Sequence, residues 1–137
     1  MSVGVAGKVK CDDNLECSLT SGGGQLAQKC CWNSSTESGS CALSVNSCTS
    51  PLTTIRCDSK NDCSSGQVCC YTRSLLVSPT MPSATCQDTC PSGTQIGVTR
   101  FELCAPAPLP VLPCGINASC VPVTNNPYLP AGYHRCQ

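Results

Sequence analysis

Hydrophobic and polar residues alternate over the first ten residues of the chain. Val3, Val5 and Val9 share one side of this alternation, with Gly7 between them. A period of two is typical of a β-strand. Chain ends also fray readily, so residues 1–10 are either an N-terminal strand or a tail.

A second alternation covers residues 94–103 and predicts a strand that leads into Cys104. Phe101 and Leu103 lie on one side of this strand, and Val98 lies on the other. No stretch of the chain has a helical period of useful length. We therefore expect short antiparallel β-hairpins with little or no helix.

Apolar residues also gather between Cys70 and Cys86, where Leu75 and Leu76 follow Arg73. This segment, residues 71–85, is either a β-hairpin packed on its own module or an exposed binding loop formed by Arg73, Leu75 and Leu76. The first interpretation is favoured, because a small core needs those apolar side chains.

Prolines dominate residues 105–113, where four of nine residues are proline. Proline fixes φ and removes a backbone donor, so we expect an extended polyproline II conformation. Residues 110–113 match the PxxP pattern of ligands for aromatic grooves. The segment is held between Cys104 and Cys114, which favours a rigid spacer. Residues 121–132 form a second proline-rich loop.

Cysteine is the most informative residue type in the chain. Sixteen of 137 residues are cysteine, about 12%, which exceeds the level that marks disulfide scaffolds. The even number allows every cysteine to pair, and such chains occur outside the reducing cytosol, so we expect a secreted or extracellular protein. The first residues contain no secretory signal. We therefore expect that a signal was removed before Met1 or that export uses another route.

The order of the cysteines repeats along the chain. Residues 11–48 and residues 55–90 each hold six cysteines in the order C…C…CC…C…C, and both begin with a five-residue gap. Residues 91–137 hold the remaining four, together with the proline-rich loops. Adjacent cysteines seldom bond to each other, because the eight-membered ring is strained, so each is expected to reach a separate partner. The sequence thus predicts three cysteine-rich modules after residues 1–10.

Charge and hydrophobicity restrict the classes of partner. Eight acidic and eight basic residues give zero net charge, which argues against nucleic acid or an anionic membrane surface. No window reaches the roughly 18 apolar residues of a transmembrane helix, so no membrane insertion is expected. With one Trp, one Phe and three Tyr, a conventional core is thin and disulfides must replace it. The weakly charged segment after residue 90 favours self-association or attached carbohydrate.

Residue types suited to a metal site or to catalysis are scarce. No CxxC or CxC spacing occurs, which argues against zinc and against a thiol–disulfide oxidoreductase. The single histidine, His134, would have to be the base for any serine or cysteine nucleophile, and we expect it to be a solvated residue near the terminus. No catalytic motif accompanies it. We expect no enzyme activity, no metal and no cofactor.

Two further groups of polar residues have more than one interpretation. Asp58, Asn61 and Asp62 are either calcium ligands or, as favoured here, turn-forming and capping residues. Asn33 and Asn117 each begin a glycosylation sequon. Asn33 is the better candidate for a glycoprotein site, because it lies in an open polar loop while Asn117 sits in a tight cystine loop.

The order C…C…CC…C…C resembles the cystine-knot framework of knottins, and two copies in tandem resemble a double-knot protein. The phrase DC…G…CC between Asp62 and Cys70 is also similar to the cysteine-rich modules of the dickkopf and colipase type. The resemblance covers residues 11–90. The twelve residues after Cys17 and the fifteen after Cys70 are longer gaps than knottins usually have.

The knottin resemblance implies a pairing for the first twelve cysteines. The implied disulfides are Cys11–Cys31, Cys17–Cys41, Cys30–Cys48, Cys57–Cys70, Cys63–Cys86 and Cys69–Cys90. The last four cysteines have no counterpart in knottins. For them we expect Cys104–Cys120 and Cys114–Cys136.

Two function classes follow from these observations. The first is a non-enzymatic extracellular protein, a disulfide-stabilised and self-assembling building block of a filament, coat or matrix. The repeats, the zero net charge and an N-terminal strand able to add to a neighbour's sheet favour it. The alternative is a knottin-like secreted protease inhibitor or toxin that uses the loop at residues 71–85. A chain without net charge and with 4% aromatic residues is atypical of channel toxins.

Overall fold

A computed structural model describes residues 8–11, 16–18, 28–43, 48, 52–74, 82–91, 93–95, 97–106, 113–115 and 118–137. Within these residues the structure is almost entirely β-strand, and the one helical element is a short 3₁₀ turn, η1 (Lys60–Asp62). All sixteen cysteines form disulfides. The chain is thus a small disulfide-rich β fold with almost no helix, as the sequence predicted. No described helix has the length and apolar character needed to cross a membrane.

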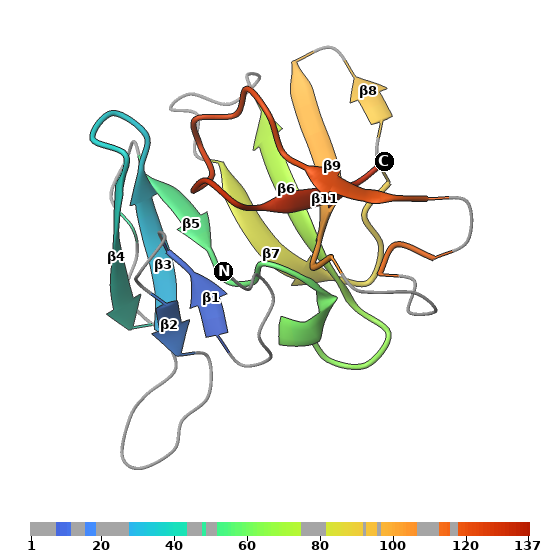
Figure 1. The fold of residues 1–137 in the computed structure, drawn as a ribbon, viewed down its shortest axis with the longest axis horizontal. Coiled ribbons are helices and arrows are strands. Elements are labelled where there is room, and N and C mark those ends of the chain that lie inside the picture. The colour runs from blue at the N-terminus through green and yellow to red at the C-terminus, as the bar shows by residue number, and fades with distance from the viewer. Residues whose placement is uncertain are drawn as a thin grey trace.

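One sheet of nine described strands runs through the molecule in the order β10–β11–β9–β6–β7–β5–β3–β4, with β8 beside β9 (Figure 1). Every neighbouring pair is antiparallel except the parallel pair β5 and β7. A separate antiparallel pair is formed by β1 (Lys8–Lys10) and β2 (Glu16–Ser18). The strands of the large sheet are β3 (Gln28–Asn33), β4 (Ser38–Leu43), β5 (Thr53–Ile55), β6 (Val68–Ser74), β7 (Ser83–Gln87), β8 (Gly93–Gln95), β9 (Val98–Cys104), β10 (Cys120–Pro122) and β11 (His134–Cys136).

Three β-hairpins repeat along this sheet: β3–β4, β6–β7 and β10–β11. In each hairpin two cysteines lie opposite each other across the strands without bonding to each other. The opposed residues are Cys30 and Cys41, Cys69 and Cys86, and Cys120 and Cys136. Each of them is bonded to a cysteine earlier in the chain than its hairpin, and the order of these bonds is the same in all three units.

Single strands join the three hairpins into one sheet. β5 lies between β3 of the first hairpin and β7 of the second. β9 lies in the same way between β6 of the second hairpin and β11 of the third. β5 comes just before Cys57 and β9 ends at Cys104, and each of these is the first cysteine of its unit. The three cysteine-rich segments therefore share one continuous sheet.

The core lies on one face of this sheet. Ala84, Tyr71 and Phe101 are cross-strand neighbours on that face and are buried, and the rings of Tyr71 and Phe101 stack with centroids 4.8 Å apart. The loop between β10 and β11 covers the face and adds Leu129 and Tyr133 to the core. Figure 1 shows this C-terminal segment passing in front of β6 and β7. The loop thus supplies apolar side chains that the short strands do not.

Trp32 links the first unit to the third. Its indole Nε1 donates a hydrogen bond of 3.0 Å to the carbonyl oxygen of Pro127, although the two residues lie at opposite ends of the sequence. The Trp32 side chain is buried, so this contact ties the loop to the far side of the sheet.

The expected single strand over residues 94–103 is wrong. Gly97 has a φ of 80°, and the chain reverses there between β8 and β9. A left-handed backbone at this position suits glycine, which has no Cβ. The strand that leads into Cys104 is therefore β9 alone. Among the other predicted segments, residues 1–7 and 107–112 lie outside the described residues.

Half of the expected disulfides agree with the structure. The agreeing pairs are Cys17–Cys41, Cys63–Cys86, Cys104–Cys120 and Cys114–Cys136. The pairs Cys11–Cys31, Cys30–Cys48, Cys57–Cys70 and Cys69–Cys90 are wrong, because the adjacent cysteines are exchanged. The structure has Cys11–Cys30, Cys31–Cys48, Cys57–Cys69 and Cys70–Cys90.

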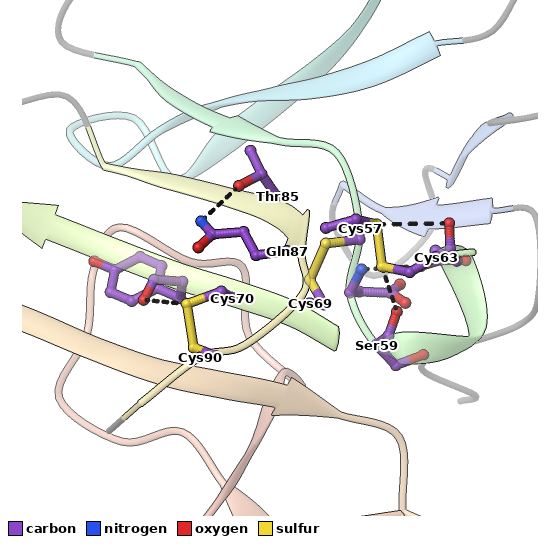
Figure 2. The surroundings of a disulfide bond; sticks show 12 residues. Cys57, Ser59, Cys63, Cys69, Cys70, Thr85, Gln87 and Cys90 are labelled. Carbon is purple, nitrogen blue, oxygen red and sulfur yellow. Dashed lines mark hydrogen bonds between the residues drawn. A yellow bond between two sulfur atoms is a disulfide. The ribbon is translucent and has the colours of Figure 1, made fainter. Parts of the chain in front are cut away.

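The pleat of a strand explains the exchange. Successive side chains of β6 point to opposite faces of the sheet, so Cys69 and Cys70 cannot reach the same region. The sulfurs of Cys57, Cys63 and Cys86 lie within 4.8 Å of one another, and Cys86 is the cross-strand neighbour of Cys69. Cys57 therefore bonds Cys69 (Figure 2), while Cys70 on the other face bonds Cys90. The same alternation in β3 separates Cys30 from Cys31.

Disulfide mapping provides a direct test of this pairing. Partial reduction and alkylation followed by tandem mass spectrometry should join Cys57 to Cys69 and Cys90 to Cys70. No residue separates Cys69 from Cys70, so fragmentation in the spectrometer has to resolve the two. A Cys57–Cys70 linkage in the native protein would contradict the placement of these residues on opposite faces.

Gly39 in β4 allows the first unit to close. A Cβ at residue 39 would lie 2.6 Å from the carbonyl oxygen of Cys11 and 2.5 Å from its sulfur. The Cys11 backbone has little freedom to move away, because a disulfide holds it to Cys30. The close approach of β4 to Cys11 therefore requires glycine.

Substitution of Gly39 by alanine should destabilise the fold. We expect Gly39→Ala to lower the free energy of unfolding by about 1–3 kcal/mol, as overpacking of a closed site does. Denaturant titration of the oxidised protein measures this. Ser40→Ala, at an exposed position of the same strand, should change stability by less than about 0.5 kcal/mol. Equal effects of the two substitutions would rule out the steric explanation.

Candidate functional site

The cysteine sulfurs form three compact groups. The groups are Cys11, Cys17 and Cys41; Cys57, Cys63 and Cys86; and Cys104, Cys114 and Cys120. Each group lies where two disulfides of one unit pack together, so every sulfur in it is already bonded to another sulfur. Metals bind the thiolate form of cysteine, which a disulfide does not offer. These groups are the crosslinked centres of the three units.

The acidic residues near Cys57 organise the η1 turn. The backbone N–H of Asp58 donates to a carboxylate oxygen of Asp62 at 2.9 Å. The hydroxyl of Ser59 accepts a hydrogen bond of 3.3 Å from the N–H of Asn61. These bonds agree with the turn-forming and capping interpretation for the side chain of Asp62, whereas Asp58 and Asn61 take part through their backbone N–H groups and the N-cap side chain of η1 is Ser59.

The favoured interpretation of residues 71–85 as a β-hairpin agrees with the antiparallel pairing of β6 with β7. Arg73 belongs to β6, not to a loop, and it is half-buried with its guanidinium carbon 4.8 Å from the centre of the Tyr128 ring. The alternative interpretation, in which Arg73 belongs to an exposed binding loop, is therefore wrong. Leu75 and Leu76 lie outside the described residues.

Asn33, the first sequon asparagine, is the last residue of β3. Its side-chain oxygen accepts hydrogen bonds from the N–H groups of Ser35 and Thr36, at 2.9 Å and 3.3 Å. The open polar loop expected here is thus a tight turn over residues 34–37 that joins β3 to β4. Asn117, the second sequon asparagine, lies outside the described residues.

His134 lies in a strand and not in a flexible tail. It is a half-buried residue of β11, and its Nδ1 is 3.0 Å from the carbonyl oxygen of Gly132. This hydrogen bond lies in an exposed setting, which agrees with the expectation of a solvated residue near the terminus. Pairing of β11 with both β9 and β10 fixes the residue in place.

One edge strand of the sheet, β10, contains a proline that limits pairing with a further strand. The N–H groups of Ser119 and Val123 donate toward β11, to Gln137 and Tyr133. Because neighbouring residues of a strand alternate in direction, residues 120 and 122 direct their backbone groups outward. Residue 122 is proline and has no N–H. A further strand would find few donors on this edge.

The other edge, β4, has no such protection among the described residues. At β5, the backbone N–H groups of Thr54 and Arg56 donate to residues at β7. Backbone hydrogen-bonding groups of successive residues point to opposite sides of a strand, so those of Thr53 and Ile55 point toward β3. The residues of β3 opposite these two therefore bond β5, and the residues between them bond β4. This register leaves the backbone groups of Gly39, Cys41 and Leu43 pointing outward from β4. The strand has neither proline nor charge, and Leu43 is 36% exposed. Among the described strands, β3 alone pairs with β4, so the outer side of β4 has no partner there.

Comparison of the chain with family models, with curated proteins and with solved structures found no match. The sequence resemblance to knottins or to dickkopf and colipase modules therefore has no support from a relative. The open edge at β4 is the feature of the described residues that points most directly to a function.

Tyr133 should make the fold sensitive to alkaline pH. Burial raises the pKa of its hydroxyl well above the ordinary value of 10.0, and the nearby carboxylates of Asp58 and Asp62 raise it further. In the unfolded chain the group ionises near pH 10, so the unfolded state loses its proton first. Stability that is present below about pH 10 is therefore lost as the pH rises above it.

Denaturant titrations at several pH values above 10 measure this loss. The fall in unfolding free energy should be smaller in Tyr133→Phe than in the unsubstituted protein, because the variant lacks the group whose pKa differs between the two states. Tyrosinate absorbance should reach its final value only as the circular dichroism of the fold disappears. An unchanged pH slope in Tyr133→Phe would exclude Tyr133 as the source.

Proposed function

We propose that this protein is a non-enzymatic, secreted building block of an extracellular assembly, such as a filament, coat or matrix. The single observation that carries the proposal is the open, uncharged edge of a continuous sheet at β4. Stable monomers usually protect such an edge with charge, proline or a covering segment, because an unpaired edge attracts another strand. The opposite edge has this protection in Pro122.

The repeated units indicate what would pair with β4. In the second and third units the second hairpin strand, β7 or β11, is paired on its outer side by the strand that precedes the unit. β4 is the corresponding strand of the first unit, and no described strand occupies the same position beside it. Strand addition at β4 would therefore fill a position that is filled in the other two units, in parallel orientation beside β7 and in antiparallel orientation beside β11.

A second copy of the chain is the partner that fits best. Residues 1–7 carry the alternating Val3 and Val5 and come before β1, which precedes the first unit as β5 and β9 precede theirs but pairs with β2. A strand donated from one copy to β4 of the next makes a head-to-tail contact, which propagates into an open chain of subunits. Zero net charge reduces the repulsion between copies.

Secretion is proposed on the basis of the disulfides. Eight crosslinks among 137 residues require an oxidising compartment to form and persist. They also stabilise a chain with few large apolar residues, which suits a protein that has to survive outside the cell. Sugar attached at Asn33 would project from the turn beside β4.

The alternative, a protease inhibitor or toxin acting through residues 71–85, gains no specific support. An inhibitory arginine has to be displayed on an exposed loop, whereas Arg73 is packed on Tyr128 within β6.

Sedimentation or light scattering of the oxidised protein over a concentration series tests the proposal. We expect association that weakens in Leu43→Lys, which places a charge on the open edge, and in a variant that lacks residues 1–7. Gln87→Lys is the matched control, because it adds the same charge at an exposed position of the interior strand β7.

The outcomes separate the parts of the proposal. A monomer at all concentrations would overturn it. Association that is lost in Gln87→Lys as well as in Leu43→Lys would attribute the effect to net charge and not to the edge. If association survives removal of residues 1–7 but is lost in Leu43→Lys, the contact would be direct pairing of β4 with β4 of another copy and not a donated N-terminal strand.

A further inference from the structure

A cavity of about 350 Å³ lies on the core face of the sheet, where β6, β9 and β11 meet the loop that follows β10. Two arginines, Arg73 and Arg135, line it, and its described lining contains no acidic residue. This is a local concentration of positive charge in a chain whose net charge is zero. A cavity of this size is within the range of small-molecule sites.

Aromatic rings hold both arginines in fixed positions. The guanidinium carbon of Arg135 lies 4.2 Å from the centre of the Phe101 ring, and that of Arg73 lies 4.8 Å from the centre of the Tyr128 ring. Phe101 in turn stacks on Tyr71, which is completely buried. A guanidinium that rests on a ring keeps its edge nitrogens free, and these nitrogens form the planar fork that matches a carboxylate.

Neither arginine uses its full set of donors within the described residues. The Nε atoms of Arg73 and Arg135 are buried and have no hydrogen-bond partner there. The register of the sheet places both side chains on the face that carries Tyr71 and Phe101. Glu102, the one acidic residue of β9, lies on the opposite face by strand alternation. Among the described residues, both cations therefore lack a carboxylate partner on the face where they meet.

The remaining polar lining consists of neutral amides and hydroxyls. Thr99, Thr124, Asn125 and Gln137 contribute to it, together with Asn126. The side-chain oxygen of Asn126 accepts from the hydroxyl of Tyr71 at 3.5 Å and from the N–H of Tyr128 at 3.0 Å. Its side-chain oxygen is thus already used within the protein. Neutral amides and hydroxyls are suited to ligand hydroxyls.

We infer that this cavity binds the carboxylate of a sugar acid, with Arg73 and Arg135 on the carboxylate and the neutral polar groups on the sugar hydroxyls. The two guanidinium groups favour a ligand with a carboxylate. The neutral polar groups of the lining favour a ligand whose other polar groups are hydroxyls and not further charges. The inference is independent of the proposed association through β4, since the cavity lies at the other end of the sheet.

Titration of the full oxidised chain with galacturonate, followed by NMR or calorimetry, tests the inference. We expect saturable binding that weakens at least about tenfold in Arg135→Gln and in Arg73→Gln, because each removes a charged donor. Arg73→Lys should also weaken binding, since it keeps the charge but loses the fork. Arg100→Gln, the same change on β9 but on the opposite face, should leave binding unchanged.

Further measurements with control ligands and on each variant decide among the explanations. Galactose, which has no carboxylate, should not bind detectably at the same concentrations. If N-acetylglutamate binds more tightly than galacturonate, the ligand class is not a sugar acid. Absence of galacturonate binding to the unsubstituted protein, or equal loss in Arg100→Gln and Arg135→Gln, would overturn the site itself. Circular dichroism of each variant confirms that the fold is retained, and saturation-transfer NMR on the ligand gives a readout without substitution.

Discussion

The structure depends on two disulfides that hold each hairpin to the segment before it. In all three units the opposed cysteines of the hairpin reach back to two earlier cysteines, and the sulfurs pack together at the centre. This arrangement replaces the large apolar core that a chain with one Trp and one Phe does not have. The strands that join the units then merge three small crosslinked bodies into one sheet.

The sequence predicted the general character of the fold well. Cysteine number and order indicated the disulfide-rich class and the repeat along the chain, and the period-two alternation with no helical period indicated β-strands. It could not assign Cys30 and Cys31, or Cys69 and Cys70, to their partners, because that choice depends on which face of a strand each side chain occupies. The turn at Gly97 was also missed, since the alternation continues across it and only the positive φ of the glycine reveals the reversal.

The candidate sites were much harder to predict, because they arise from pairing between distant segments. The open edge at β4 exists only because of the order of strands across the sheet, which no local pattern specifies. In the same way, Arg73 and Arg135 lie far apart in the sequence and meet on one cavity through the pairing of β6, β9 and β11. For Arg135, the sequence offered one indication of a binding role: it is one of the few charged residues in the segment after residue 90.

The adjacent cysteines have a mechanical consequence. In the first unit a continuous covalent route runs from Cys11 through its bond to Cys30, across one peptide link to Cys31, and on to Cys48. The second unit has the same shortcut, from Cys57 through Cys69 and Cys70 to Cys90. A pulling force applied to the two ends would pass along these shortcuts and leave the hairpin loops slack. The first two units would therefore resist lengthening until a sulfur–sulfur bond broke, and extension would be confined to the residues outside them and to the third unit, whose cysteines are not adjacent.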